Sequence, residues 1–249
     1  MPLAAPVLQD NVAVGAAQPG WPAPFALRPG EPLRVLVMDK NDITQRRVFE
    51  LPAQRVFRVG NAHETSDGQV VLIFIGTPDA GFLDQGAVAL MSAKPSPAGY
   101  NSSTQIATLD MKTGKARQQS IDGEVEFLRI DLHRIGRAAR WLLTGASWRS
   151  LADRQNALLH GVQLLDVYSG RRQRFDCGEQ MVVEEHILVP KPGKSGELDA
   201  WLLGTTFDAR RQATVLNVLD AAHIADGPIA QAVLPYMLPL GFHGNFTAD

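Results

Sequence analysis

The residues of this chain that could bind a transition metal are its histidines, and they are scattered rather than grouped. The six histidines stand at positions 63, 133, 160, 186, 223 and 243. No pair of them has the short spacing of a zinc motif, and the single cysteine, Cys177, has no second cysteine to complete a CxxC pair. A metal site in this chain would therefore have to be assembled from side chains on distant elements.

Other reactive motifs are absent from the sequence. There is no GxSxG, no GxxxxGK[ST] and no HExxH, and the segment Gly76 to Gly81 does not fit a dinucleotide-binding turn. The usual hydrolase, NTPase, zinc-peptidase and Rossmann interpretations therefore lack their reacting or phosphate-binding groups.

The elements that would position these side chains are short strands. From Leu33 onward the chain is dominated by apolar runs of strand length that are bounded by turn residues. The clearest runs are Leu33 to Met38, Gln69 to Ile75, Ile106 to Leu109, Trp141 to Thr144, Val162 to Leu165, Trp201 to Phe207 and Val215 to Leu219. Only Gly81 to Met91 and Ser150 to His160 look helical, and we expect both to be short connecting helices.

A weak internal repeat links several of these runs. An apolar strand ends in an aspartate, turns, and resumes as a second strand; the aspartates are Asp39, Asp110, Asp166 and Asp220. Aspartate accepts hydrogen bonds from nearby amides and a following glycine takes positive φ, so the pattern predicts hairpins. Hairpins that recur at roughly 55 to 70 residues are typical of β-propeller blades, and a β-sandwich with common turns is the alternative.

Composition indicates a globular chain without a marked charge. Hydrophobic residues make up 45% and charged residues 20% of the 249 residues, with a formal net charge of -2. This balance predicts no nucleic-acid partner. No apolar run is long enough for a transmembrane segment, Met1 to Phe25 lacks the pattern of a signal peptide, and the lone cysteine favours a reducing compartment. We therefore expect a cytoplasmic protein.

Four stretches, read in order, resemble the family of the retinal pigment epithelium protein, the carotenoid oxygenases and the lignostilbene dioxygenases. They are Phe57-Arg-Val-Gly-Asn-Ala-His-Glu64, Glu126-Phe-Leu-Arg-Ile-Asp131, Glu185-His-Ile-Leu-Val-Pro190 and Pro239-Leu-Gly-Phe-His-Gly-Asn-Phe246. They are similar to the family patterns Phe-His-x-x-Asn-Ala-aromatic-Glu, Glu-Phe-Pro-x-Ile-(Asn/Asp), Glu-Pro-x-Phe-Val-Pro and Pro-x-Gly-Phe-His-Gly-x-Phe. The resemblance covers the C-terminal half of such a protein, from about Phe25 to Asp249.

The resemblance implies an all-β fold, a partial seven-bladed β-propeller of about the four C-terminal blades, with residues 31–249 in the propeller and 1–30 as an irregular lead-in. Members of the family hold Fe(II) on four histidines and use O2 to split an alkene of a hydrophobic polyene or stilbene. By position His243 is the fourth metal ligand, Glu185 is the carboxylate that orients it, and Glu126 is the carboxylate that serves the third ligand.

The sequence departs from the family at the third ligand, which is replaced by Arg58. A guanidinium stays protonated and offers no lone pair to iron. We expect Arg58 to form an ion pair with Glu126 instead, because either group unpaired near a buried axis would cost several kcal/mol. His63 is expected to be a packing residue, and strand parity predicts that His186 faces away from the axis.

These residues leave two hypotheses for the function. The first is an Fe(II) dioxygenase that cleaves a conjugated double bond. The second is a truncated, catalytically inactive propeller fragment, which acts as a binding element or as one half of a split enzyme. Since His243 is the one credible iron ligand, we expect the chain alone to retain little iron. Open blade faces also predict a partner, either a missing N-terminal half or a second copy of the chain.

Overall fold

The computed structural model of the protein describes residues 12–14, 25–27, 30–79, 81, 101–150, 158–241 and 243–247. These residues are almost entirely β-strand and form two compact units, the first within Met1–Gly123 and Gly136–Ala138 and the second within Glu124–Ile135 and Ala139–Asp249. The all-β prediction is confirmed. The segments predicted as connecting helices fall largely on residues 82–91 and 151–157, outside the described part of the chain.

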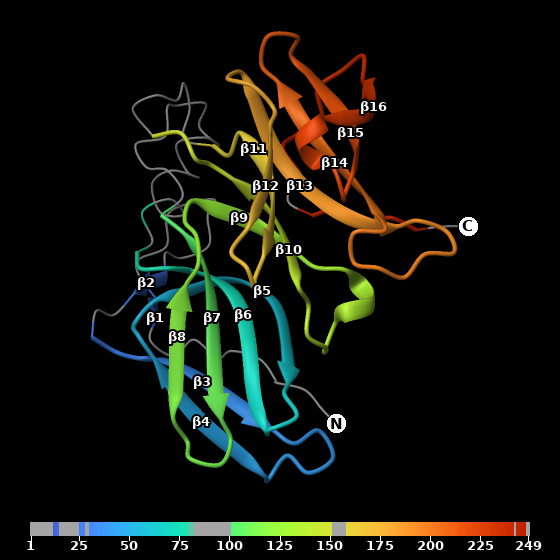
Figure 1. Cartoon of the computed structure of the whole chain (residues 1–249). Helices are drawn as coiled ribbons and strands as arrows, with labels where there is room; N and C mark the ends of the chain where they lie inside the picture. Colours follow the sequence, from blue (N-terminus) through green and yellow to red (C-terminus); the bar gives the residue numbers. More distant parts are fainter. Residues whose placement is uncertain are drawn as a thin grey trace. The chain divides into compact units, whose positions relative to one another are not determined.

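The first unit contains three antiparallel sheets, with strand orders β1-β2, β3-β4 and β5-β6-β7-β8 (Figure 1). Its strands are β1 (Val12–Val14), β2 (Phe25–Leu27), β3 (Leu33–Met38), β4 (Arg46–Leu51), β5 (Arg55–Glu64), β6 (Gln69–Thr77), β7 (Ser103–Asp110) and β8 (Ala116–Ser120). The β1-β2 ribbon lies in the segment of residues 1–30 that was expected to be an irregular lead-in. The boundary at residue 30 stays a prediction.

The second unit contains two four-stranded antiparallel sheets, β9-β10-β11-β12 and β13-β14-β15-β16 (Figure 1). Its strands are β9 (Val125–Arg129), β10 (Trp141–Ala146), β11 (Gly161–Asp166), β12 (Arg172–Asp176), β13 (Met181–Pro190), β14 (Ala200–Asp208), β15 (Ala213–Asp220) and β16 (Pro228–Val233). Two single turns of 3-10 helix accompany them, η2 (Leu132–Arg134) and η4 (Ile224–Asp226). No helix among the described residues is long and apolar enough to cross a membrane.

The core of each unit follows from the pattern of its strands. β3 alternates, so that Leu33, Val35 and Val37 pack inward against apolar residues of β6 and β7. In contrast, every residue of β10 and β11 is buried. These are the two central strands of their sheet, and a strand that is covered on both faces needs no polar alternation. All seven apolar runs identified in the sequence are confirmed as strands.

The aspartate repeat forms the predicted hairpins. The Oδ1 atom of Asp110 accepts hydrogen bonds from the amides of Lys112 at 2.8 Å and Thr113 at 3.0 Å. Asp166 makes the equivalent contacts two and three residues further along the chain, and the turns close on glycines with positive φ, Gly114 at 78° and Gly170 at 71°. Asp110, Asp166 and Asp220 each end the third strand of a four-stranded sheet.

A second repeat marks the first two strands of each four-stranded sheet. The register to the second strand shifts once in β9 and once in β13, and twice in β5, so each first strand carries at least one β-bulge. The second strand places a glycine beside one bulge of each first strand: Gly76 pairs with Val56, Gly145 with Glu126, and Gly204 with His186. A Cβ on Gly204 would clash with the His186 ring and lie 2.6 Å from the carbonyl oxygen of Glu185. The three sheets thus share one plan, and their bulges lie in the motif segments that carry the candidate site residues.

Candidate functional site

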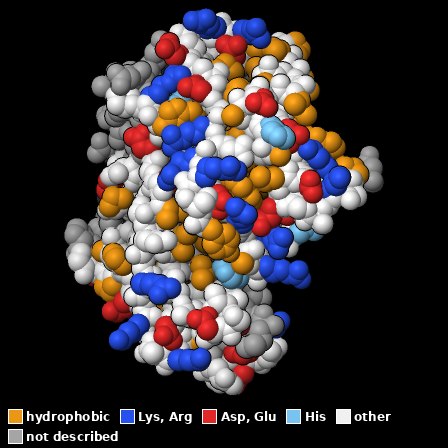
Figure 2. All heavy atoms as spheres, in the orientation of Figure 1, with side chains coloured by type: hydrophobic (Ala, Val, Ile, Leu, Met, Phe, Trp, Pro, Cys, Tyr) orange, Lys and Arg blue, Asp and Glu red, His pale blue; other side chains and the backbone are white. Residues whose placement is uncertain are grey.

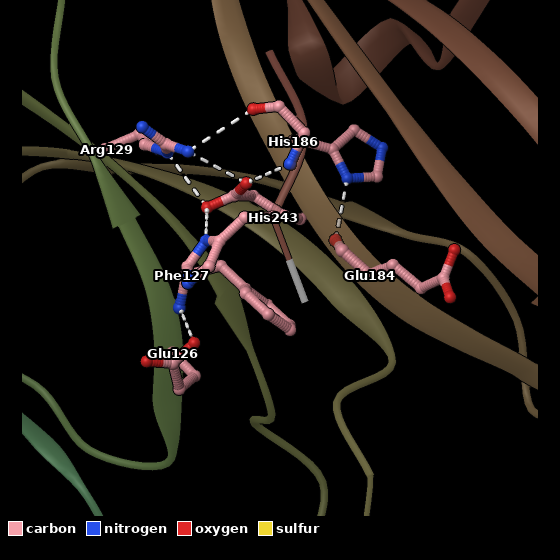
Figure 3. A network of polar contacts seen from close by, with 8 residues as sticks. Glu126, Phe127, Arg129, Glu184, His186 and His243 are labelled. Carbon is pink, nitrogen blue, oxygen red and sulfur yellow. Dashed lines mark hydrogen bonds and ion pairs between the residues drawn. The ribbon is translucent and has the colours of Figure 1, made fainter. Parts of the chain in front are cut away.

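Glu185 and His243 meet in the second unit, although 58 residues separate them in the sequence. The distance from His243 Nδ1 to Glu185 Oε1 is 3.1 Å. Glu185 comes from the bulge of β13, and its side chain is only 4% exposed. His243 comes from the segment that follows β16 (Figure 3). The two residues that the sequence pairs are therefore in direct contact.

This contact determines which nitrogen of His243 carries the proton. An ionised carboxylate can only accept, so Nδ1–H donates to Glu185, and this contact selects the tautomer whose lone pair lies on Nε2. The His243 side chain is 47% exposed and borders a cavity of about 200 Å³, whose apolar lining includes Ile187, Leu203 and Leu216. A neutral imidazole held by a carboxylate in this way is suited to bind a divalent transition metal.

Glu185 holds more than the histidine. Arg129 at the end of β9 donates through Nε to Oε1 at 2.8 Å and through Nη2 to Oε2 at 2.9 Å. The amide of Gly244 donates to Oε2 at 2.7 Å. Burial raises the pKa of Glu185, but the donors Arg129, Gly244 and His243 together outweigh burial and hold that pKa below its ordinary value. The carboxylate is therefore ionised at neutral pH.

Glu184, the neighbour of Glu185, also binds the C-terminal segment, which the sequence did not predict. Its Oε1 accepts from the amide of Gly241 at 2.6 Å, and its Oε2 accepts from the hydroxyl of Thr205. Both glutamates are buried. In a regular strand neighbouring side chains point to opposite faces, but the bulge in β13 lets both carboxylates reach the segment Gly241–Asn245.

Glu126 lies in β9 beside its bulge and is 1% exposed. Its Oε2 accepts a hydrogen bond from the amide of Phe127 (Figure 3). Phe127 has a φ of 57°, a conformation that is strained for an aromatic residue. The backbone at this glutamate thus departs from regular strand geometry, as it does at Glu185.

Arg58 lies at a bulge of β5 in the first unit, whereas Glu126 belongs to the second unit. The ion pair between them stays a prediction. In the same strand Asn61 has a structural role: its amide donates to the carbonyl of Arg137 at 2.8 Å and accepts from the amide of Gly136 at 3.1 Å. The asparagine of this motif therefore fixes the loop at residues 136–138 within the first unit.

The other motif histidines are tied to backbone or packing. His186 is buried, and its Nδ1 donates to the carbonyl of Glu184 at 3.1 Å. Figure 3 shows its ring turned away from His243. Burial lowers the pKa of His186 to about 4. Burial also lowers the pKa of His63, in keeping with a packing role. Both rings are therefore neutral at ordinary pH.

An iron site requires several imidazole or carboxylate side chains that converge on one point, and the described residues do not supply them. They contain no group of three or more His, Cys, Asp or Glu side chains that could hold a metal ion. One imidazole, His243, borders the cavity, and a guanidinium stands at the Arg58 position. These residues alone do not fit the four-histidine set that the resemblance implies. The metal roles of His243, Glu185 and Glu126 stay a proposal.

Comparison with known proteins gives a family match over most of the chain. The model of the retinal pigment epithelial membrane protein family matches residues 6–248. The carotenoid 9,10(9',10')-cleavage dioxygenase 1 of Phaseolus vulgaris is 27% identical over 82% of this chain and 38% of its own length. The apocarotenoid-15,15'-oxygenase of Synechocystis is 26% identical over 96% of this chain and 49% of its own length.

A shorter match reaches the stilbene-cleaving branch. The lignostilbene-alpha,beta-dioxygenase isozyme III of Sphingomonas paucimobilis is 30% identical over 49% of this chain and 26% of its own length. Among solved structures, a cobalt-substituted form of the Synechocystis apocarotenoid oxygenase superposes with a TM-score of 0.77 and 21% identity, over 90% of this chain and 46% of the other. This likeness shows a shared fold.

The chain spans less than half the length of each of these relatives. Within that span, the family match and the collinear motif segments agree with the resemblance seen in the sequence. The chain belongs to the retinal pigment epithelial membrane protein family, among whose members are carotenoid, apocarotenoid and lignostilbene cleavage oxygenases.

Proposed function

We propose that this chain is the C-terminal part of a non-haem Fe(II) dioxygenase that cleaves a conjugated carbon–carbon double bond with O2. The substrate class is a carotenoid, an apocarotenoid or a stilbene, as in the names of the relatives. The observation that carries the proposal is the 3.1 Å contact between Glu185 and His243. Such a carboxylate fixes the tautomer and the orientation of a metal-binding imidazole.

The shared plan of the four-stranded sheets supports a propeller arrangement. Each sheet is an up-and-down meander with a bulge in its first strand and an aspartate turn after its third. In a propeller the first strands converge on the axis. Arg58, Glu126 and Glu185 each lie in the first strand of a four-stranded sheet.

A second polypeptide segment is needed to complete such a site. His243 is one donor, and Fe(II) is retained by several converging ligands. The surface also favours binding of a partner, because large apolar side chains are exposed in the second unit after β15. They include Ile229, Tyr236, Met237, Leu238 and Leu240. Figure 2 shows apolar side chains at the surface in this part of the molecule (upper right). We propose that the N-terminal half of a family member supplies both the missing donors and the cover.

A second candidate function is favoured by Arg58. A guanidinium cannot act as a metal ligand, so a protein that keeps the scaffold with this residue could serve as a binding element without oxygenase chemistry. Hydrophobic ligands of the same class would suit its apolar surfaces. The two candidates differ in one property, which is whether the chain joins an iron-retaining assembly.

The test restores the third imidazole and supplies the missing half. The chain is produced anaerobically with Fe(II), alone and together with the N-terminal half of the Synechocystis apocarotenoid oxygenase. Bound iron is quantified, and cleavage of a stilbene and an apocarotenal is assayed under O2. We expect Arg58→His to raise iron retention of the complex by about tenfold or more, and His243→Ala to abolish that gain. Arg46→His, which adds a histidine at an exposed site of β4, is the matched control.

The outcomes separate the two candidates. Stoichiometric iron and turnover in the isolated wild-type chain would refute the need for a second segment. If the complex forms but Arg58→His and Arg46→His retain equally little iron, the ligand position is wrongly assigned and the non-catalytic binding element is favoured.

A further inference from the structure

Arg129 makes the most extensive contact with the Glu185 carboxylate, yet it occupies the variable position of its motif. In the pattern Glu-Phe-Pro-x-Ile that begins at Glu126, Arg129 is the unspecified residue. Its guanidinium binds both carboxylate oxygens, at 2.8 Å and 2.9 Å, in a parallel two-point geometry. The Arg129 side chain is 27% exposed and that of Glu185 is 4% exposed, so the pair is largely shielded from water.

Each oxygen of Glu185 is shared between Arg129 and the C-terminal segment. Oε1 accepts from Arg129 Nε and from His243 Nδ1, and Oε2 accepts from Arg129 Nη2 and from the amide of Gly244. Arg129 Nη2 also donates to the carbonyl of Gly244 at 3.3 Å. Arg129 therefore contacts the segment directly as well as through the glutamate (Figure 3).

The two sides of this network differ in secondary structure. Arg129 and Glu185 stand on strands β9 and β13, whose backbones are held by their ladders. His243 and Gly244 lie in a segment without regular secondary structure. A carboxylate that binds single donors can still rotate about the bond to its carboxyl carbon. Two-point binding by a guanidinium fixes the carboxylate plane. The direction of the Nδ1–H bond from His243 follows that plane.

We propose that Arg129 is a positioning residue for His243: it fixes the Glu185 carboxylate, which in turn holds the His243 ring through Nδ1 and docks the backbone at Gly244. This inference rests on the proposed function only in giving His243 the role of a metal ligand. Glu184, which binds the amide of Gly241, completes the docking at the other end of the segment.

The experiment compares Arg129→Gln with a matched control, Arg140→Gln, in the full metal-free chain. Arg140 binds the 1% exposed Asp166 through Nε at 3.1 Å and Nη2 at 2.7 Å, on strand β11 of the same unit. Two properties are measured. The first is the ¹⁵N signature of the His243 tautomer, assigned with His243→Gln. The second is the rate of proteolytic cleavage within the residues that follow Leu234.

Arg129→Gln should lose the fixed Nδ1–H signature and raise the cleavage rate by about tenfold or more, because the docked segment opens more often. Arg140→Gln should leave the His243 signature and the cleavage rate within about twofold of wild type. Arg129→Lys, which keeps the charge but can bind only one oxygen well, should restore part of the signature.

The proposal is overturned if folded Arg129→Gln keeps the wild-type signature and cleavage rate, or if Arg140→Gln changes them equally. Should Arg129→Gln fail to fold, Arg129→Lys decides alone: a wild-type signature there would refute the need for two-point binding. Since neither readout involves iron, these outcomes are independent of the iron-retention test.

Discussion

At the residue scale, the Glu185 carboxylate carries the largest number of contacts in the candidate site. It is 4% exposed and joins Arg129, His243 and Gly244. Each of these contacts is assisted by the charge on the carboxylate, which makes them stronger than neutral hydrogen bonds. The state of this one group therefore controls both the orientation of the histidine and the docking of the C-terminal segment.

Glu185→Gln should lower the free energy of unfolding of the second unit by about 2 to 3 kcal/mol at neutral pH, because the partly buried Arg129 guanidinium loses its counter-charge. Urea unfolding measures this loss. Glu50→Gln is the control, since Glu50 pairs with Arg34 at 3.6 Å on an exposed surface. Its effect should stay below about 0.5 kcal/mol.

The effect of Glu185→Gln should also depend on pH. Because the pKa of Glu185 is lowered by folding, its contribution to stability is complete above its unfolded pKa of about 4.3 and is lost as pH falls through the folded value. The difference in stability between wild type and Glu185→Gln should therefore shrink below about pH 4. A difference that stays constant down to the acid limit would contradict the ionised state of the folded carboxylate.

At the element scale, the bulges in β5, β9 and β13 decide where the motif side chains point. A regular strand would send Glu184 and Glu185 to opposite faces, and the bulge removes that restriction. Gly204 on the neighbouring strand makes room for the bulge in β13, and Gly145 makes room for the Phe127 ring in β9. A Gly-Thr or Gly-Ala pair recurs at the end of the apolar run within the second strand of each sheet, at Gly76, Gly145 and Gly204. This pair is a sequence signal that could have located the bulges.

Gly204→Ala should destabilise the second unit by about 2 kcal/mol, because a methyl group there collides with the His186 ring and the Glu185 carbonyl. Thermal unfolding checks this value. Gly244→Ala is the matched control within the same site, since a Cβ on Gly244 meets no atom within 4 Å. It should change stability by less than about 0.5 kcal/mol. Equal effects from both substitutions would argue against the bulge as the cause.

At the scale of the whole molecule, the chain has the fold of part of a larger relative and exposes apolar side chains. It covers 38% of the Phaseolus dioxygenase and 46% of the Synechocystis structure. Tyr236, Met237, Leu238 and Leu240, which follow β16, are exposed to solvent. Exposed apolar side chains in such a group favour association with another surface.

The isolated chain should therefore self-associate at micromolar concentration, and Met237→Ser with Leu240→Ser should weaken that association by about tenfold. Sedimentation velocity over a concentration series measures it. Ile43→Ser is the control, because Ile43 is 68% exposed but lies in the hairpin between β3 and β4, in the first unit. A monomer at all concentrations would rule out this role for the segment.

The sequence by itself determined the interior strands, the aspartate turns, the family and the pairing of Glu185 with His243. Apolar runs identify β6, β7, β10, β11, β14 and β15, because central strands are buried and carry a strong local signal. The first strands gave no such run, since they carry polar motif residues. They were located through the family resemblance instead.

Only the tertiary structure decided the roles of Arg129 and Glu184 and the contact of both glutamates with one segment. These contacts join residues 56 to 59 positions apart. Their geometry depends on the bulge in β13, because in a regular strand the side chains of Glu184 and Glu185 would point to opposite faces. Local sequence patterns encode periodicity within a strand. They do not encode where a periodicity is interrupted or which distant segment then fits beside it, because that depends on packing between sheets.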